Sequence, residues 1–208
     1  FELIKHRVKR RREPYIQRWQ RIERAQHVIL LISFFGLAIT GFALRAQNGW
    51  WVRAIGLGDE TLRSNIHRAL AVIMTAEAFF HLGWLIATRR GRGAVAAMAP
   101  GPHDFVHFGR NMAYHLGFTA ERPAFRRFDY TQKAEYWAVV WGTMVMALTG
   151  LVLWFPEVAT SYAPAWVVRV AEVVHFYEAI LAVAAIFIWH FFYVIFMPAE
   201  YPVSTVWL

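Results

Sequence analysis

Cysteine is absent from the 208 residues of this chain. Its absence excludes disulfide bonds, covalent c-type haem attachment and cysteine-ligated iron–sulfur clusters within the chain. Charged residues are scarce as well, at 17%, against about 25% in an ordinary soluble domain. Any redox centre that this chain binds must therefore be held by histidine, of which the sequence has nine.

Apolar residues are abundant instead, at 58% of the chain, and 17% of all residues are aromatic. Four stretches are long enough to cross a bilayer as helices: Ala25–Leu44, Ile66–Thr88, Ala134–Phe155 and Val167–Met197. The first apolar run is too long for a cleavable signal peptide, and no small-residue cleavage site follows it. We therefore expect residues 1–208 to form a single all-α domain, an integral membrane four-helix bundle.

The net charge of +8 is distributed unevenly along the chain. Nine Lys and Arg residues precede the first span and eight lie between the second and third, whereas the other two connections hold only four. By the positive-inside rule, both termini and the central loop are cytoplasmic. Topology and anionic lipid headgroups account for these cations. We therefore expect a multi-pass protein of the bacterial inner membrane, in contact with the lipid bilayer and with no nucleic acid partner.

The central loop, Gly91 to Tyr130, is too long for a simple connection. We expect its glycines and prolines to interrupt any helix, at Gly91, Gly93, Pro100, Gly101 and Pro102. After them, residues His103–Leu116 space their apolar side chains at helical intervals. We expect an interfacial amphipathic helix in this segment.

Two of the predicted spans each contain a pair of histidines about four helical turns apart. His67 and His81 are 14 residues apart, and His175 and His190 are 15 apart. Each pair therefore spans about 21 to 22 Å along its helix, within about 60° of one face. Two such helices could form two stacked cavities in which imidazoles ligate a haem iron from both sides. The topology places His67 and His175 toward the outer side, while His81, His190 and His27 compete for the inner site.

A short internal repeat relates the two halves of the chain. Ala38–Gly41 reads Ala-Ile-Thr-Gly and Ala147–Gly150 reads Ala-Leu-Thr-Gly, and each motif precedes an outer histidine by 26 or 25 residues. This repeat predicts two parallel helix pairs about a pseudo-twofold axis along the membrane normal. The small Thr-Gly residues would allow close helix approach or leave room for a flat macrocycle.

Five segments in order along the chain carry a resemblance to a known family: Arg21–His27, Asn65–Arg68, Gln132–Trp137, Leu148–Trp154 and His175–His190. They resemble the di-haem cytochrome b subunit of membrane-bound formate dehydrogenases, a family that includes the cytochrome b of nickel–iron hydrogenases. The C-terminal segment is most similar to a branch that accompanies periplasmic multihaem c-type cytochromes. The resemblance implies two haem b groups between the membrane quinone pool and a periplasmic multihaem cytochrome or iron–sulfur subunit.

The resemblance also implies a set of haem ligands. His67 and His175 would hold the outer haem, and His27 and His190 the inner one. The repeat instead favours pairing His81 with His190, because the position equivalent to His27 in the second half is a tyrosine. The family generally lacks a histidine at the position of His81, and it spaces its last histidine pair by 14 residues rather than 15. We expect His27 as the inner ligand and keep His81 as the alternative.

The entrance to the third span is the predicted quinone site. The family has an Asn-x-Gly tripeptide there, followed by Gln-Lys, and this chain has Asp129-Tyr130-Thr131 before Gln132. Such donors and acceptors suit the oxygens of menaquinone or ubiquinone, and an aspartate could also take a proton. A helix cap formed by Asp129 or Thr131 explains the same residues, and the two interpretations are compatible.

We therefore expect an electron-transfer subunit of a quinone-linked oxidoreductase complex. Electrons would pass between a periplasmic redox partner, the outer haem, the inner haem and the quinone. The alternative is a haem-free membrane transporter or assembly scaffold that uses its intramembrane histidines as a proton relay. A purified protein without a Soret band would indicate that alternative.

Overall fold

The computed structural model describes residues 19–46, 48–121 and 128–196, and this part of the chain is helical without any strand. Its long helices are α2 (Arg21–Arg45), α4 (Glu60–Ala87), α7 (Tyr130–Trp154) and α9 (Trp166–Ala184), with α9 continued by the π-helical turns η1 (Ala185–His190) and η2 (Phe192–Phe196). Counting α9 with its continuation as one span, all four are long and apolar enough to cross a membrane. The predicted all-α four-span fold is confirmed. The expected end of the last span, Met197, lies outside the described residues.

The first three spans begin four to six residues earlier than the apolar pattern predicted, because their first turns are polar but capped. The Asp59 carboxylate accepts the Leu62 N–H at 2.6 Å, and the Asp129 carboxylate accepts the Gln132 N–H at 2.8 Å. At the start of α2, the Gln20 N–H donates to Glu23 at 2.6 Å. Such contacts satisfy backbone groups that a helix end leaves open, so a polar turn can extend an apolar helix.

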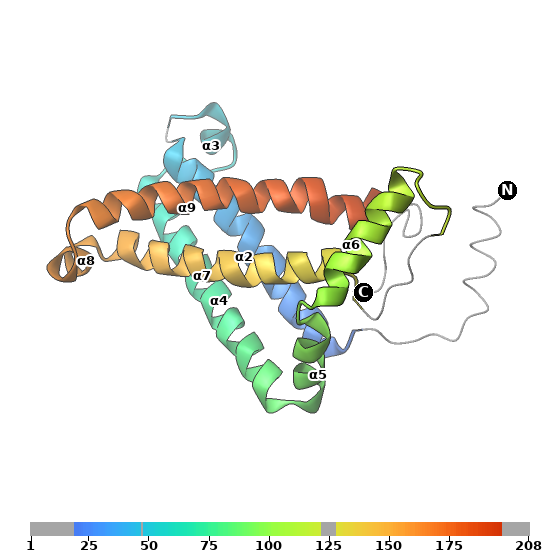
Figure 1. Cartoon of the computed structure of the whole chain (residues 1–208). Coiled ribbons are helices and arrows are strands. Elements are labelled where there is room, and N and C mark those ends of the chain that lie inside the picture. Colours follow the sequence, from blue (N-terminus) through green and yellow to red (C-terminus); the bar gives the residue numbers. More distant parts are fainter. Residues whose placement is uncertain (1–18, 47, 122–127, 197–208) are drawn as a thin grey trace.

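The spans associate as two helix pairs, α2 with α4 and α7 with α9, and the pairs cross one another (Figure 1). The short helices α3 (Trp50–Ala54) and α8 (Pro156–Tyr162) join the members of each pair at one end of the bundle. The helices α5 (Arg89–Met98) and α6 (Pro102–His115) connect the two pairs at the other end. We call the end with α3 and α8 the outer end, and the end with α5 and α6 the inner end.

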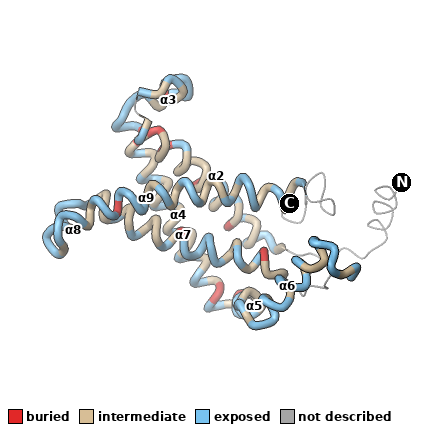
Figure 2. The backbone as a smooth tube through the Cα atoms, turned by 45° about the horizontal axis from the view of Figure 1, so that its top comes forward, coloured by how far each residue is buried: buried red, intermediate tan, exposed pale blue. Residues whose placement is uncertain are grey.

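Most large apolar side chains of the spans face outward. Ile188 is 75% exposed, Phe79 is 70% exposed, and the buried apolar residues in the described part of the chain are only Ala43, Val52, Leu85 and Ala171. Figure 2 shows the same pattern along the tube, with few buried positions in any helix. Outward apolar side chains are stable when the surrounding solvent is hydrocarbon. The exposure pattern therefore agrees with a bundle that sits in a bilayer.

The central connection holds two helices where we predicted one. The predicted segment His103–Leu116 corresponds to α6, but the preceding glycine-containing stretch is also helical and forms α5. Its first turn is capped by Thr88, whose hydroxyl oxygen accepts the Gly91 N–H at 2.9 Å. A Cβ atom at Gly91 would clash with the backbone of Trp84 and Leu85, so this glycine allows a tight turn between α4 and α5. We predicted that Gly91 interrupts a helix, but it lies within α5 and allows α5 to pack closely against the end of α4.

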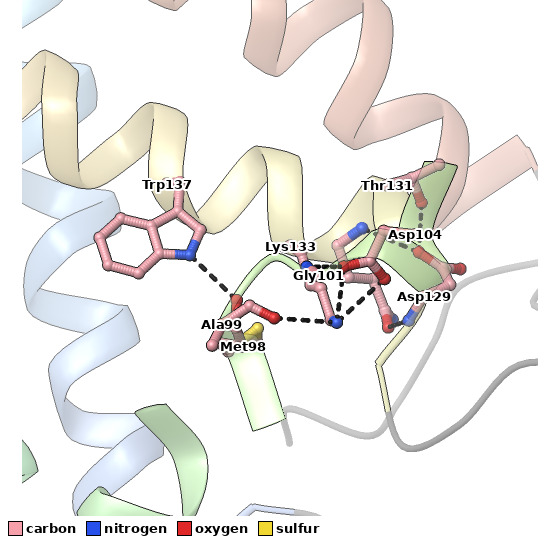
Figure 3. Close-up of polar contacts among 9 residues, drawn as sticks. Met98, Ala99, Gly101, Asp104, Asp129, Thr131, Lys133 and Trp137 are labelled. Carbon is pink, nitrogen blue, oxygen red and sulfur yellow. Dashed lines mark hydrogen bonds and ion pairs between the residues drawn. The ribbon is translucent and has the colours of Figure 1, made fainter. Parts of the chain in front are cut away.

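Polar contacts fasten this connection to the inner end of the bundle (Figure 3). Lys133 on α7 donates to the Ala99 carbonyl at 3.1 Å and to both oxygens of Asp104 at 3.0 Å. Burial raises the pKa of Asp104, but hydrogen bonds from Lys133 and the Gly101 N–H, together with the Lys133 charge, outweigh it and lower the pKa below its ordinary value. On the other side, Arg90 of α5 forms a bidentate ion pair with Glu23 of α2 at 2.8–2.9 Å.

Candidate functional site

The two predicted outer histidines meet at the interface between the helix pairs. His67 on α4 and His175 on α9 have ring centroids 6.3 Å apart and an interplanar angle of 67°. Two metal–nitrogen bonds of about 2.0 Å, with about 1.2 Å from each nitrogen to its ring centre, would put the centroids about 6.4 Å apart. The spacing of these imidazoles thus suits one iron held between them.

Each of these imidazoles is bound by the threonine of the repeated motif in the partner helix. Thr40 Oγ1 lies 2.9 Å from His67 Nδ1, and Thr149 Oγ1 lies 2.9 Å from His175 Nδ1. The Thr40 hydroxyl donates its own hydrogen to the Gly36 carbonyl at 2.7 Å, and Thr149 does the same to Val145 at 2.7 Å.

This arrangement determines which ring nitrogen carries the proton. A hydroxyl has one hydrogen, so a threonine that donates it to a carbonyl can only accept from the histidine. The Nδ1–H of each ring therefore donates to threonine, and Nε2 keeps its lone pair. Metal-ligating histidines commonly donate their other N–H in this way, which fixes both tautomer and orientation.

The glycine of each repeated motif makes room for the same ring. A Cβ at Gly41 would lie 3.2 Å from Cε1 of His67, and one at Gly150 would lie 3.4 Å from Cε1 of His175. The first distance is tight for a carbon–carbon contact and the second is at the short end of the ordinary range, so a larger residue would press on the His67 ring and touch the His175 ring. The Thr-Gly pair therefore positions and accommodates an imidazole. We did not infer this role from the sequence, where we expected the pair to allow close helix approach or to leave room for a macrocycle.

The three histidines at the inner level separate into two groups. His81 Nδ1 lies 2.6 Å from Gln26 Oε1, and His81 Nε2 lies 3.1 Å from the Tyr136 hydroxyl. Both nitrogens of His81 are thus engaged by protein groups from α2 and α7. Gln26 and Tyr136 lie in segments that carry the family resemblance, but their contacts with His81 were not inferred from the sequence, because each contact joins residues 55 positions apart on different helices.

The other two inner histidines come from α2 and the π-helical turn η1. The elements that carry them are in contact, since the ring centroids of Phe35 on α2 and Phe187 on η1 lie 6.1 Å apart. The ring of His27 contacts Trp19 edge-on at 5.3 Å, and His190 Nδ1 lies 3.4 Å from a carboxylate oxygen of Glu135. A carboxylate behind an imidazole is a common partner of metal-ligating histidine. The donor chemistry at both levels therefore fits a haem iron with two imidazole ligands.

The predicted quinone residues form the capped first turn of α7, with Asp129 as the N-cap residue (Figure 3). The Asp129 carboxylate accepts from the Thr131 hydroxyl at 2.6 Å and from the Gln132 N–H at 2.8 Å. The Gln132 side chain in turn accepts the Asp129 N–H at 3.2 Å. Thr131 is buried and Gln132 is exposed. The helix-cap interpretation is confirmed for Asp129, while the quinone interpretation stays a prediction.

The fold and the chemistry of these residues define a class of protein, a multi-span helical bundle able to hold a redox cofactor between its helices. The chain belongs to the prokaryotic cytochrome b561 family, which matches residues 18–204. No curated protein matches it. The family resemblance seen in the sequence is thus confirmed. The protein is a membrane cytochrome b of prokaryotic type that binds haem b and serves electron transfer, which argues against a haem-free transporter or scaffold.

Proposed function

We propose that this cytochrome binds two b haems and carries electrons across the membrane between a periplasmic redox partner and quinone. His67 and His175 hold the outer haem, and His27 and His190 hold the inner one. The observation that carries the proposal is the outer pair, whose rings are 6.3 Å apart and whose Nδ1 atoms each contact a threonine at 2.9 Å. Haem, when bound, supplies a one-electron iron couple.

The residues around the outer pair orient the ligands before any haem arrives. Threonine contacts fix the ring tautomer, and Gly41 and Gly150 allow the rings to approach the neighbouring helix backbones. The same contacts keep each Nε2 directed away from the threonine, so the site requires little rearrangement. Pre-organised ligands lower the cost of binding.

For the inner haem, His27 is supported over His81 by the hydrogen bonds at this level. A ligand needs one ring nitrogen with an available lone pair. Both nitrogens of His81 have protein partners, at 2.6 and 3.1 Å. His27 instead lies on α2, which packs through Phe35 against Phe187 of η1, the turn that carries His190. His81 is then a structural residue that joins α2, α4 and α7.

The periplasmic partner would dock on the outer end, where large aromatic residues are exposed. Tyr162 is 90% exposed, Trp50 81% and Trp166 63%, and all three lie in or beside the short outer helices. Such residues suit a membrane interface or a protein interface. A multihaem c-type cytochrome or an iron–sulfur subunit would bring its redox centre near the outer haem there.

The quinone, menaquinone or ubiquinone, would bind at the inner end, near Asp129, Thr131, Gln132 and the inner haem. The cytoplasmic assignment of this end follows from the positive-inside rule, with the protein in the inner membrane. Asp129 is half-buried at the N-cap of α7, so its carboxylate is accessible to water.

A haem count on the purified chain tests the proposal. We expect two low-spin b haems per chain in a reduced-minus-oxidised spectrum, all extractable by acid–acetone because the chain lacks cysteine. Finding one haem or none would contradict it.

Alanine variants then assign the ligands. His67→Ala and His175→Ala should each remove only the outer haem, and His27→Ala and His190→Ala only the inner one, as measured by low-temperature spectra and redox titration. His81→Ala is the matched control and should keep both haems. If His81→Ala loses the inner haem and His27→Ala retains it, our assignment is wrong and the inner ligands are His81 and His190, as the repeat predicts.

A further inference from the structure

Arg63 is a buried cation near the outer histidines. Arg63 is only 2% exposed, although it lies near the N-terminal end of α4. Its Nη1 donates to the carbonyls of Leu57 and Gly58 at 2.7 and 3.0 Å, and its buried Nε has no hydrogen-bond partner. In the described part of the chain, no carboxylate pairs with Arg63.

Burying a cation in this position is costly. A charge removed from water without a counter-charge is strongly destabilised. The N-terminal end of a helix is itself partially positive, which disfavours a cation in the first turns of α4. The acidic residues nearby do not offset this, because Asp59 accepts the Leu62 N–H and Glu60 is exposed. The two carbonyls stabilise one end of the guanidinium, and its remaining donors suit an anion.

The position of Arg63 relative to His67 indicates which anion. The two residues are four apart on α4, so they lie on one face about 6 Å apart along the axis. Arg63 is on the outer side of His67, and His67 faces His175. The group that occupies the space between these imidazoles therefore lies one turn from the buried guanidinium.

We propose that Arg63 binds a haem propionate carboxylate at the outer site and raises the reduction potential of that haem. This inference rests on the proposed function, since it takes His67 and His175 as the outer ligands. An adjacent cation favours the reduced iron, which carries one positive charge fewer than the oxidised iron. The guanidinium also presents two parallel donors, which match the geometry of a carboxylate.

Redox titration of the full-length protein in detergent tests this role. In Arg63→Gln, the reduction equilibrium of the outer haem should shift at least tenfold toward the oxidised form, which equals 59 mV for one electron. The inner haem should keep its potential. Arg63→Lys retains the charge and should shift the equilibrium of the outer haem less than threefold.

The matched control is Arg53→Gln. Arg53 is an exposed arginine on α3 at the same end of the bundle, so its charge is screened by water. It should leave both potentials unchanged. If Arg63→Gln holds both haems at unchanged potentials, Arg63 only supports the loop before α4 or binds an outer lipid phosphate, and the proposal is wrong.

A second measurement covers the case in which Arg63→Gln fails to hold its outer haem. The resonance Raman bending modes of haem propionates respond to hydrogen bonding at the carboxylate. The frequencies of these modes at the outer haem should differ between the wild-type protein and Arg63→Lys, because lysine replaces the planar guanidinium by a single ammonium group. An unchanged mode would overturn the proposal. Failure of the proposed function would look different, because the wild-type protein would then lack two low-spin haems.

Discussion

Single hydrogen bonds decide the chemistry of the outer pair. Thr40 and Thr149 each donate to the helix carbonyl four residues earlier and accept from a histidine Nδ1. The hydroxyl therefore connects the backbone of one helix to the imidazole of its neighbour. Without it, the ring could turn and present either nitrogen.

We expect Thr40→Val to weaken binding of the outer haem about 10- to 100-fold, the usual effect of losing the residue behind a metal-bound histidine. Haem retention after dilution in detergent, followed by the outer-haem spectrum, measures this. Thr40→Ser keeps the hydroxyl and should behave as the wild-type protein. Equal losses in the valine and serine variants would mean that the threonine methyl group, not the hydroxyl, supports the ring.

At the scale of elements, the π-helical turn η1 sets the position of His190. In a uniform α-helix, 15 residues turn the chain by about 60° beyond four full turns, so His190 would rotate away from the face of His175. A π-helix bonds each N–H one residue further back and turns the chain less per residue. Residues 185–190 adopt this form. The π-helical turn thus reduces the rotation that the 15-residue spacing of His175 and His190 would otherwise produce.

Changing the length of this turn tests its role. Deletion of Ile188 restores a 14-residue spacing, so an α-helix can place the last histidine on the same face, and the inner haem should be retained. Insertion of one alanine after Ile188 adds about 100° of rotation and should abolish the inner haem. The outer haem, held by His175 above the change, is the internal control in both spectra. An inner haem that survives the insertion would refute a positioning role for η1.

The clamp between Lys133 and Asp104 holds the α5–α6 turn on α7, with side chains 16% and 17% exposed. Because the folded-state pKa of Asp104 is lowered, its contribution to stability is present above the unfolded pKa and is lost as pH falls through the folded pKa. We expect hydrogen exchange in residues 98–104, corrected for intrinsic rates, to rise as the pH falls below about 4.

Asp104→Asn removes the charge and should raise exchange in this turn at neutral pH, by an amount that corresponds to about 0.2–1 kcal/mol. Its exchange should then lack the acid-dependent rise. The backbone around the Arg90–Glu23 ion pair, where α5 contacts α2, should stay protected in both proteins. The same acid-dependent rise in Asp104→Asn would assign the effect to another carboxylate.

At the scale of the whole molecule, the proposed tasks of the protein lie at the two opposite ends of the bundle. The outer end holds the His67–His175 pair and the exposed aromatic residues, and the inner end holds the capped start of α7 and the α5–α6 connection. In the proposed orientation, electrons enter or leave at the outer end, whereas quinone protons exchange with the cytoplasm.

Asp129→Asn separates the capping role of Asp129 from a proton-transfer role. Asparagine caps helices as well as aspartate does, but it cannot accept a proton. We expect quinone-coupled haem oxidation or reduction to slow about 10²–10⁴-fold with both haems present. Stopped-flow kinetics with a soluble quinol measure this.

Asp59→Asn is the control, because it makes the same chemical change at a helix N-cap at the outer end, away from the proposed quinone site. Unchanged kinetics in Asp129→Asn would move the quinone site elsewhere, most plausibly to the outer haem. Slowing only in Asp129→Ala would mean that the loss of the helix cap is responsible.

The sequence by itself determined the number of spans, their approximate ends, the family and the two histidine levels. Each depends on local pattern: an apolar run long enough for a bilayer, and histidine spacings that keep two side chains near one face of a helix. The Thr-Gly repeat was visible in the sequence as well, but the contacts of its threonines with His67 and His175 were not inferred from it.

Only the tertiary structure decided which side chains meet across helices. The angle and rotation of one helix against another set these contacts, and no local spacing encodes them. The structure thereby placed His81 between Gln26 and Tyr136, and packed α2, which carries His27, against the turn that carries His190. It also buried Arg63 without a carboxylate partner in the described part of the chain. In a low-dielectric bundle, unpaired polar groups are costly, so these cross-helix contacts determine where a charged cofactor can bind.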